Sequence, residues 1–373
     1  MKKIVFIIPH LAGGGAEHVA ATLSRYFPEN VETVFTLFED KIEYDYRGRV
    51  ILLNLKSEEG IIKKIVNIFR RYFKLKKIIK AEKPDAVISF MESSNFLNVL
   101  CNPGGAIVSV RAHPSVNYKN DPFNRMIVRS YNFAKKIISV SSEIREDLVD
   151  NFGIGRDKIK VIYNPADTAE VEKMASVPLE PEDEKIFSGC GVIITAGRMN
   201  NQKNHASLIR AFHMAMPYIE GAKLVILGRG ELEQDLKKLA ADLNISDKVY
   251  FPGFQKNPYK FIARSRLFVL SSLYEGFPNT LIEAMICKTP LVSSRCPSGP
   301  AEIFDGAGFN NLFEPGDCAA MASRMITFYK RDNKDMISFY EKKLSELSKE
   351  KIAAEYLEAC GICLKEGMRD ERN

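Results

Sequence analysis

The sequence contains no apolar run of about 18 residues, the length that a membrane-spanning helix needs. Residues 4–8 are apolar and follow two lysines, as in a signal peptide, but Pro9 and His10 interrupt the run and a glycine-rich turn follows. We therefore expect residues 4–8 to form a buried strand and the chain to stay in the cytoplasm.

Cysteines are few and show no metal-ligand spacing: seven are scattered through 373 residues. Cys360 and Cys363 form a Cys-x-x-Cys pair, but they lie in a helical pattern without a second pair, so we expect buried thiols. The chain also lacks the Gly-x-Gly-x-x-Gly fingerprint, repeats, low-complexity tracts and nucleic-acid-binding motifs. We expect no metal, no cofactor and no nucleic-acid partner.

The net charge of +6 is unevenly distributed. Residues 1–165 contain 26 Lys and Arg against 18 Asp and Glu, a net charge of +8, whereas the remainder contains 27 against 29, a net charge of −2. The first half is therefore the half that we expect to face an acidic partner.

Short apolar runs rich in β-branched residues alternate with helical patterns, as in parallel α/β sheets. Between the runs of a first series lie helical patterns, for example at 16–26, 61–81 and 142–151, and between those of a second series lie patterns at about 205–216, 231–243, 257–264 and 279–287. The runs lie at 4–8, 34–37, 50–53, 86–90, 106–110, 137–140 and 160–163, and then at 192–195, 223–227, 249–252, 267–270 and 291–293.

Two such series predict two doubly wound, Rossmann-like domains that face one another across a cleft. We assign residues 1–165 to the first domain and 189–349 to the second. Residues 166–188 follow Pro165, include two further prolines and an acidic stretch, and are predicted to be a linker. The C-terminal helix, at about 350–373, could return to the first domain.

Three motifs follow strands and precede helices. In the first, Gly13, Gly14 and Gly15 precede Ala16 and Glu17; a bare backbone here allows either a close ligand approach or simply a tight turn. In the second, Arg198 offers a planar fork to a diphosphate and Lys203 a point charge, unless the loop is merely a solvated polar one.

The third motif contains two carboxylates, Glu275 and Glu283, with seven residues between them. Pro278 favours a helix start and leaves the amides after it free to meet an anion. Carboxylates accept hydrogen bonds from sugar hydroxyls, so the two acids can reach different parts of one ligand. Unrelated surface acids are the alternative.

Together these motifs resemble the retaining glycosyltransferases of family four, which have the GT-B fold. The resemblance is carried by residues 192–303: Gly197 and Arg198 with Lys203, the Glu275/Glu283 pair, and the run Cys296-Pro297-Ser298-Gly299-Pro300-Ala301-Glu302-Ile303. The first glycine loop with Glu17 is also similar to the loop in the family's first domain.

The resemblance implies that Arg198 and Lys203 neutralise the diphosphate of a nucleotide-sugar donor, a UDP-sugar being favoured. It implies that Glu275 lies beside the donor sugar and that Glu283 binds the ribose. Its other donor-binding residues are Gly14, Gly15, Gly197, Gly276, Phe277, Pro278, Asn279 and Thr280, and Glu17 lies near the sugar or acceptor. The family needs no metal.

Family members carry a histidine after the fifth strand of the first domain, near the sugar. Here either Arg111 or His113 stands at that place, with His113 favoured by residue type. The expected acceptor is a glycan or a polyprenyl-linked saccharide, as in bacterial surface polysaccharide synthesis. A nucleotide-sugar epimerase or phosphorylase would be the alternative enzyme, and a non-catalytic sensor would bind the donor without turnover.

Residues 61–80 contain eight basic residues, from Lys63 to Lys80, and no acid. Apolar residues recur there at helical spacing: Ile61, Ile65, Ile68, Phe69, Tyr72, Leu75 and Ile79. A core-packed helix and a helix lying on anionic lipid both fit this pattern. We expect the apolar stripe to pack inward and the lysines to meet phosphate headgroups, which would place the protein peripherally on the inner face of the membrane.

Overall fold

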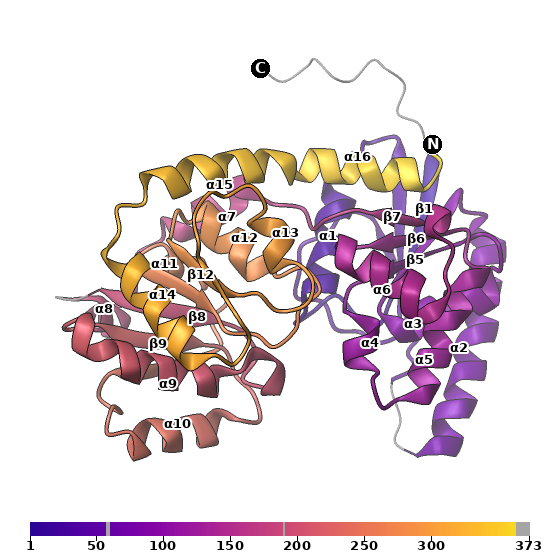
Figure 1. The fold of residues 1–373 in the computed structure, drawn as a ribbon. Coiled ribbons are helices and arrows are strands. Elements are labelled where there is room, and N and C mark those ends of the chain that lie inside the picture. The colour runs from indigo at the N-terminus through magenta and orange to yellow at the C-terminus, as the bar shows by residue number, and fades with distance from the viewer. Residues whose placement is uncertain (57–59, 189–190, 363–373) are drawn as a thin grey trace. The chain divides into compact units, whose positions relative to one another are not determined.

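The computed structural model describes residues 1–56, 60–188 and 191–362 of the chain (Figure 1). It divides into two compact units: Met1–Pro165 together with the segment that begins at Leu347, and Ala166–Glu346. Each unit is an α/β unit with one parallel sheet.

Unit 1 contains a seven-stranded parallel sheet with the strand order β3-β2-β1-β4-β5-β6-β7. All seven predicted runs form strands, with ends shifted by up to three residues. The strands are β1 (Lys2–Ile8), β2 (Val31–Leu37), β3 (Arg49–Leu52), β4 (Ala86–Phe90), β5 (Ala106–Val110), β6 (Lys136–Ser139) and β7 (Ile159–Val161). The helices are α1 (Gly15–Tyr26), α2 (Ile61–Glu82), α3 (Glu92–Cys101), α4 (Pro114–Asn117), α5 (Pro122–Ser130), α6 (Ser142–Phe152) and α16 (Lys349–Ala359).

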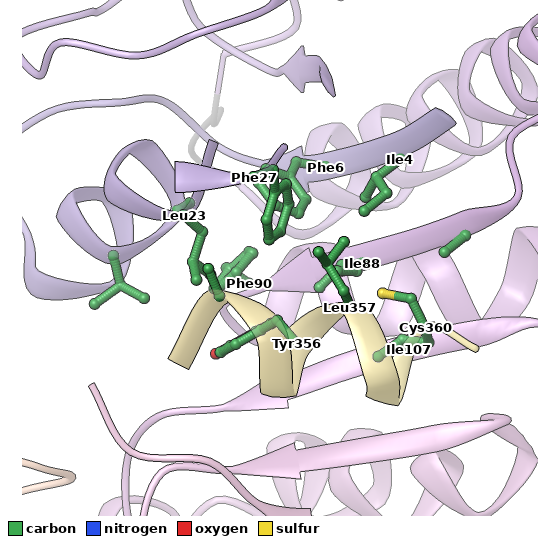
Figure 2. Close-up of a cluster of buried hydrophobic side chains, with 14 of the residues drawn as sticks. Ile4, Phe6, Leu23, Phe27, Ile88, Phe90, Ile107, Tyr356, Leu357 and Cys360 are labelled. Carbon is green, nitrogen blue, oxygen red and sulfur yellow. The ribbon is translucent and has the colours of Figure 1, made fainter. Parts of the chain in front are cut away.

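Strand β1 is buried on both faces, which explains its unbroken apolar sequence. Phe6 belongs to a core that includes α1 and α16, and Val5 belongs to the core on the other face, which includes residues of α2 and α3. Figure 2 shows Tyr356 and Leu357 of α16 within the first of these cores. Burying a leucine side chain stabilises by about 1.5–3 kcal/mol, so α16 is an integral part of unit 1.

Cys360 lies in the same core, and burial raises the pKa of its thiol to about 12. It is therefore a protonated core residue at neutral pH. The Cys-x-x-Cys interpretation also involves Cys363, which lies outside the described residues.

Unit 2 contains a six-stranded parallel sheet with the strand order β10-β9-β8-β11-β12-β13. The strands are β8 (Val192–Ala196), β9 (Lys223–Leu227), β10 (Val249–Gly253), β11 (Leu267–Leu270), β12 (Leu291–Ser294) and β13 (Leu312–Phe313). The helices are α7 (Thr168–Ala175), α8 (Pro181–Phe187), α9 (His205–Ala215), α10 (Glu233–Asp242), α11 (Tyr259–Ile262), α12 (Asn279–Ile286), α13 (Pro300–Ile303), α14 (Cys318–Lys330) and α15 (Lys334–Glu346).

Residues 166–188, for which we expected a linker, contain α7 and α8 and belong to unit 2. Pro181 occupies the first turn of α8 and the acidic residues 182–184 follow it, which is the arrangement that a helix N-terminus favours. The amide nitrogen of Asn257 donates to the Met174 carbonyl at 2.7 Å, and Lys223 Nζ donates to the Ile186 carbonyl at 2.9 Å. These bonds fasten both helices to the second unit.

Helix α2 differs from the expectation that its whole apolar stripe packs inward. Ile68, Tyr72, Leu75 and Ile79 do pack against the sheet core, but Ile65 and Phe69 are exposed, together with Val66 and Phe73. The stripe is wider than the strip of helix surface that the sheet can cover, so part of it faces outward. The expectation for Ile61 falls outside the described side chains.

Candidate active site

The strand order of the second sheet reverses between β8 and β11, and such a point is where open α/β sheets bind ligands. The loop after β8 carries Lys203 and the loop after β11 carries Glu275. Lys203 Nζ donates a hydrogen bond to Glu275 Oε1 at 2.6 Å, and Ser272 Oγ donates to the same oxygen at 2.6 Å. Two residues from separate motifs therefore form one largely buried ion pair.

The local sequence holds Lys203 in this position. Its backbone N–H donates to Asn200 Oδ1 at 3.1 Å, and its carbonyl accepts from Ser271 Oγ at 2.7 Å. A Cβ on Gly197 would lie 3.2 Å from Lys203 Cε, so the bare backbone gives the lysine side chain room to lie against the strand end.

Arg198 is exposed, and its side chain makes no hydrogen bond or ion pair with the described residues. Arg229, in the loop after β9, is also exposed and likewise has no such side-chain partner within the described part of the chain. The Met199 N–H donates to the Arg229 carbonyl at 3.0 Å, so the two arginine-bearing loops are adjacent. We had not singled out Arg229, although the run Gly228-Arg229-Gly230 after a strand was a usable signal.

The turn from Glu275 to the start of α12 rests on the run that follows β12. The Glu275 N–H donates to the Pro297 carbonyl at 3.1 Å, and Ser298 Oγ donates to the Glu275 carbonyl at 2.5 Å. Gly299, with φ +97°, has no space for a Cβ beside Phe277 and Pro278. Helix α12 begins at Asn279, and Thr280 Oγ1 is buried without a hydrogen-bond partner among the described residues, which suits an incoming polar ligand.

Glu283 lies on α12, and burial raises the pKa of its carboxyl to about 7. The charge of Lys203 and a hydrogen bond with Tyr259 act in the opposite direction. Lys203 therefore acts electrostatically on both acids of the third motif, Glu275 and Glu283. Gly197, Lys203, Glu275, Gly276 and the start of α12 come together at one edge of the second sheet.

In unit 1 the carboxylate of Glu17 fills the space next to the first glycine loop. A Cβ on Gly14 would collide with the carboxylate of Glu17, which is buried and lies with Oε1 3.6 Å from His10 Nδ1. Gly13 has φ +71°, which glycine adopts without strain, and Gly15 is the first residue of α1. The missing side chain at Gly14 thus leaves room for the Glu17 carboxylate, independently of any ligand.

Arg111 and His113 follow β5 but are held differently. Arg111 donates to Asn164 Oδ1, to the Tyr356 hydroxyl at 3.4 Å and to Ser109 Oγ at 3.5 Å, so its guanidinium is anchored within unit 1. Burial is also the main effect lowering the pKa of Arg111. His113 lies with Nδ1 3.3 Å from Asp147 Oδ2, and we had not singled out Asp147 because nothing in its surrounding sequence marks it.

Comparisons with known proteins identify the family. Residues 13–170 match the model of Glycosyltransferase Family 4, and residues 177–345 match that of Glycosyl transferases group 1. An uncharacterized glycosyltransferase of Methanocaldococcus jannaschii is 35% identical to 69% of this chain. The match covers 66% of that protein's length, just under two thirds.

A second relative, from Campylobacter jejuni, is 32% identical over 89% of this chain and 91% of its own length. It is named N-acetylgalactosamine-N,N'-diacetylbacillosaminyl-diphospho-undecaprenol 4-alpha-N-acetylgalactosaminyltransferase. The crystal structure of HepE from Anabaena in complex with UDP matches 97% of this chain and 100% of HepE, with a TM-score of 0.75 and 18% sequence identity. This match shows that the chain has the same GT-B fold. The chain therefore belongs to glycosyltransferase family four and is a glycosyltransferase.

Proposed function

We propose that this glycosyltransferase moves a sugar from a UDP-linked donor to a glycan or lipid-linked saccharide in bacterial surface polysaccharide synthesis, with retention of configuration. The observation that carries the proposal is the Lys203–Glu275 ion pair at the switch point of the second sheet, in a motif whose other cation, Arg198, has no side-chain partner among the described residues. An ion pair this buried adds little net stability, because desolvation of both charges offsets their attraction. Its place at a ligand-binding edge therefore favours a role in binding.

In this proposal the donor diphosphate replaces Glu275 as the partner of Lys203 and also binds Arg198. The two cations then stabilise the negative charge that develops on the departing phosphate. Glu275, freed from the lysine, accepts hydrogen bonds from hydroxyls of the donor sugar. The backbone of Gly276, Phe277, Pro278 and Asn279 and the unpaired hydroxyl of Thr280 would hold the sugar and phosphate, and Glu283 would hold the ribose diol.

Two side-chain cations would supply the neutralisation that other transferases obtain from a metal, so we propose that this reaction needs none. Turnover should be unchanged after treatment with a strong chelator. A chelator-sensitive reaction that a divalent cation restores would contradict this part of the proposal.

The choice of donor and acceptor is supported by the relatives. HepE was crystallised with UDP, and the Campylobacter relative is named for a diphospho-undecaprenol acceptor. Thermal stabilisation by a panel of nucleotide sugars should pick out a UDP-sugar, because a ligand that binds the folded state raises its apparent stability. Transfer is then measured with lipid-linked acceptors, and NMR of the product gives the anomeric configuration. Donor consumption without acceptor would instead indicate an epimerase, and tight binding without turnover a sensor.

We further propose that α2 of unit 1 rests on the anionic inner face of the membrane, next to the acceptor. No helix in the described residues is long and apolar enough to cross a membrane. On α2, the exposed Phe69 and Phe73 lie among exposed basic residues, a combination that suits shallow insertion into a charged lipid surface. Arg71 and Lys74 donate to the Leu55 and Leu53 carbonyls, so they serve the fold rather than the surface.

Vesicle sedimentation tests this surface. We expect binding to anionic but not to neutral vesicles, and weakening by salt because exposed charges are screened. Changing Phe69 and Phe73 to Ser, or Lys63, Lys64 and Lys77 to Gln, should reduce recovery severalfold, whereas Lys237→Gln with Lys238→Gln on α10 should not. Equal recovery of all variants would refute the docking surface while leaving the transferase proposal intact.

A further inference from the structure

Asp147, on α6, is in contact with the one candidate site histidine of unit 1. We propose that Asp147 is a positioning residue that fixes the proton of His113 on Nδ1, so that Nε2 accepts a hydrogen bond from a substrate hydroxyl. This inference rests on the proposed function, because it assigns His113 to a sugar hydroxyl.

The carboxylate of Asp147 is buried and held at both oxygens. The Ser115 N–H donates to Oδ2 at 2.9 Å, and the Asn151 amide donates to Oδ1 at 2.8 Å. Asp147 therefore holds the segment after β5 that carries His113. The His113 side chain is only 15% exposed there. A carboxylate held in this way cannot turn away from the ring.

The histidine nitrogen that faces Asp147 has nowhere else to donate. Nδ1 is buried and has no aligned hydrogen bond to any described residue, while Asp147 Oδ2 lies 3.3 Å away. Oδ2 is thus close enough to accept a hydrogen from Nδ1 once the ring is aligned with it. Because an ionised carboxylate only accepts hydrogen bonds, it selects the tautomer with the proton on Nδ1 and leaves the lone pair on Nε2.

A lone pair on Nε2 suits a sugar hydroxyl, which can donate its hydrogen. Arg111, two residues earlier, carries donors only and is already bonded to Asn164 and Tyr356. The contrast assigns the hydroxyl-accepting role after β5 to His113.

The tautomer can be read without any substrate. The chain has five histidines, so long-range proton–nitrogen NMR spectra of the ¹⁵N-labelled protein above pH 8 can resolve each ring, and His113→Gln identifies the His113 signals. We expect an unprotonated Nε2 in the wild type. Asp147→Ala, which removes the acceptor facing Nδ1, should let the proton move towards Nε2, the tautomer that a free imidazole prefers. Asp147→Asn can keep an amide oxygen where Oδ2 accepts from Ser115, so it should preserve the wild-type tautomer, as should Asp150→Ala on the exposed side of the same helix.

Activity then tests the consequence. Asp147→Ala should lower kcat/KM about tenfold to a hundredfold, the loss expected for one substrate hydrogen bond, and should have no further effect in a His113→Ala background. The proposal would be overturned by a protonated Nε2 in the wild type, by an equal loss in Asp150→Ala, or by a full additional loss in the double variant. Absence of transfer by the wild type would instead sink the proposed function, and the NMR result is independent of that outcome.

Discussion

The carboxyl edges of the two sheets have the same topology but hold their charged side chains differently. In unit 2, Lys203 and Glu275 pair with each other at the switch point, while the side chains of Arg198 and Arg229 form no bonds to described residues. In unit 1, Arg111 is bonded to Asn164 and to Tyr356 of the returning helix α16.

This difference suggests separate roles for the two edges: the unit 2 edge can bind an anion, whereas the charged side chain at the unit 1 edge is held in place by the fold. The cations at the unit 2 edge either have no side-chain partner among the described residues or, in the case of Lys203, would have to exchange one carboxylate. Freeing Arg111 would instead break its hydrogen bonds to several polar groups of unit 1. Under the proposed function, we expect unit 2 to recognise the diphosphate and the edge of the unit 1 sheet to offer mainly neutral hydrogen bonds.

The largest effect is expected at the unit 2 cations. Lys203→Ala and Arg198→Ala should each lower kcat about a hundredfold or more, because each removes a charge that, under the proposed function, stabilises the leaving phosphate. Lys237→Ala, which removes a surface lysine paired with Glu233 in the same unit, should change kcat less than twofold. An equally large loss in a folded Arg111→Ala variant, with Lys203→Ala near normal, would reverse the division.

The next effect separates the two acids of unit 2. Glu283→Gln should weaken binding of free UDP about tenfold, because an acceptor for the ribose diol loses its charge. Glu275→Gln should leave UDP binding within about twofold and lower kcat, since its proposed partner is the transferred sugar. Calorimetric titration with UDP and initial rates measure the two quantities, and equal losses of UDP affinity would show that the assigned roles are wrong.

The motifs after β8 and β11 could be predicted from the sequence because each combines a strand, a glycine and charged residues within about ten positions. That the two motifs lie close together could also be predicted, since parallel strands bring their carboxyl ends to one edge of the sheet. The 2.6 Å bond between Lys203 and Glu275 could not, because it joins residues 72 positions apart whose rotamers depend on packing.

Several other features were beyond the sequence for physical reasons. Helix α14 was missed because its fully buried residues, including Met321, Met325 and Phe328, form only a narrow stripe in a sequence rich in small side chains. Asp147 contacts His113 through a fold that brings α6 against α4, and no local pattern records that. Within 166–188, Pro181 and the acids at 182–184 resemble a linker in composition, but they mark the start of α8.

A smaller effect concerns the stability of unit 2 without ligand. The pKa of Glu283 is about 7 in the folded chain against an ordinary value of 4.5, so between these values the folded chain holds a proton that the unfolded chain has released. Stability should therefore fall as pH rises through this window, with the full penalty present above about pH 7. Glu283→Gln removes the penalty and should stabilise the ligand-free protein by on the order of 1 kcal/mol at pH 8, given the partial exposure of Glu283.

Urea unfolding of the ligand-free protein at pH 4.5 and pH 8 measures this effect, with Glu231→Gln as a surface control in the same unit. The gain for Glu283→Gln should appear at pH 8 and vanish at pH 4.5. The same variant would then be more stable and bind UDP less tightly, which is the pattern expected when a buried charge is kept for ligand binding. A gain of equal size at both pH values would mean that the carboxylate carries no burial penalty.

The smallest effect is expected at the anchor of Arg111. Tyr356→Phe removes a hydroxyl that accepts from Arg111 at 3.4 Å but keeps the ring, which stacks on Phe90 with centroids 6.4 Å apart. We expect a loss of about 0.5–1 kcal/mol in the free energy of unfolding, typical of one long hydrogen bond, with kcat and UDP affinity unchanged. Tyr218→Phe, at an exposed position of unit 2, should change neither quantity. If Tyr356→Phe instead lowered kcat tenfold without loss of stability, the Tyr356 hydroxyl would be holding Arg111 for the reaction. Charge recognition would then be shared by both sheet edges.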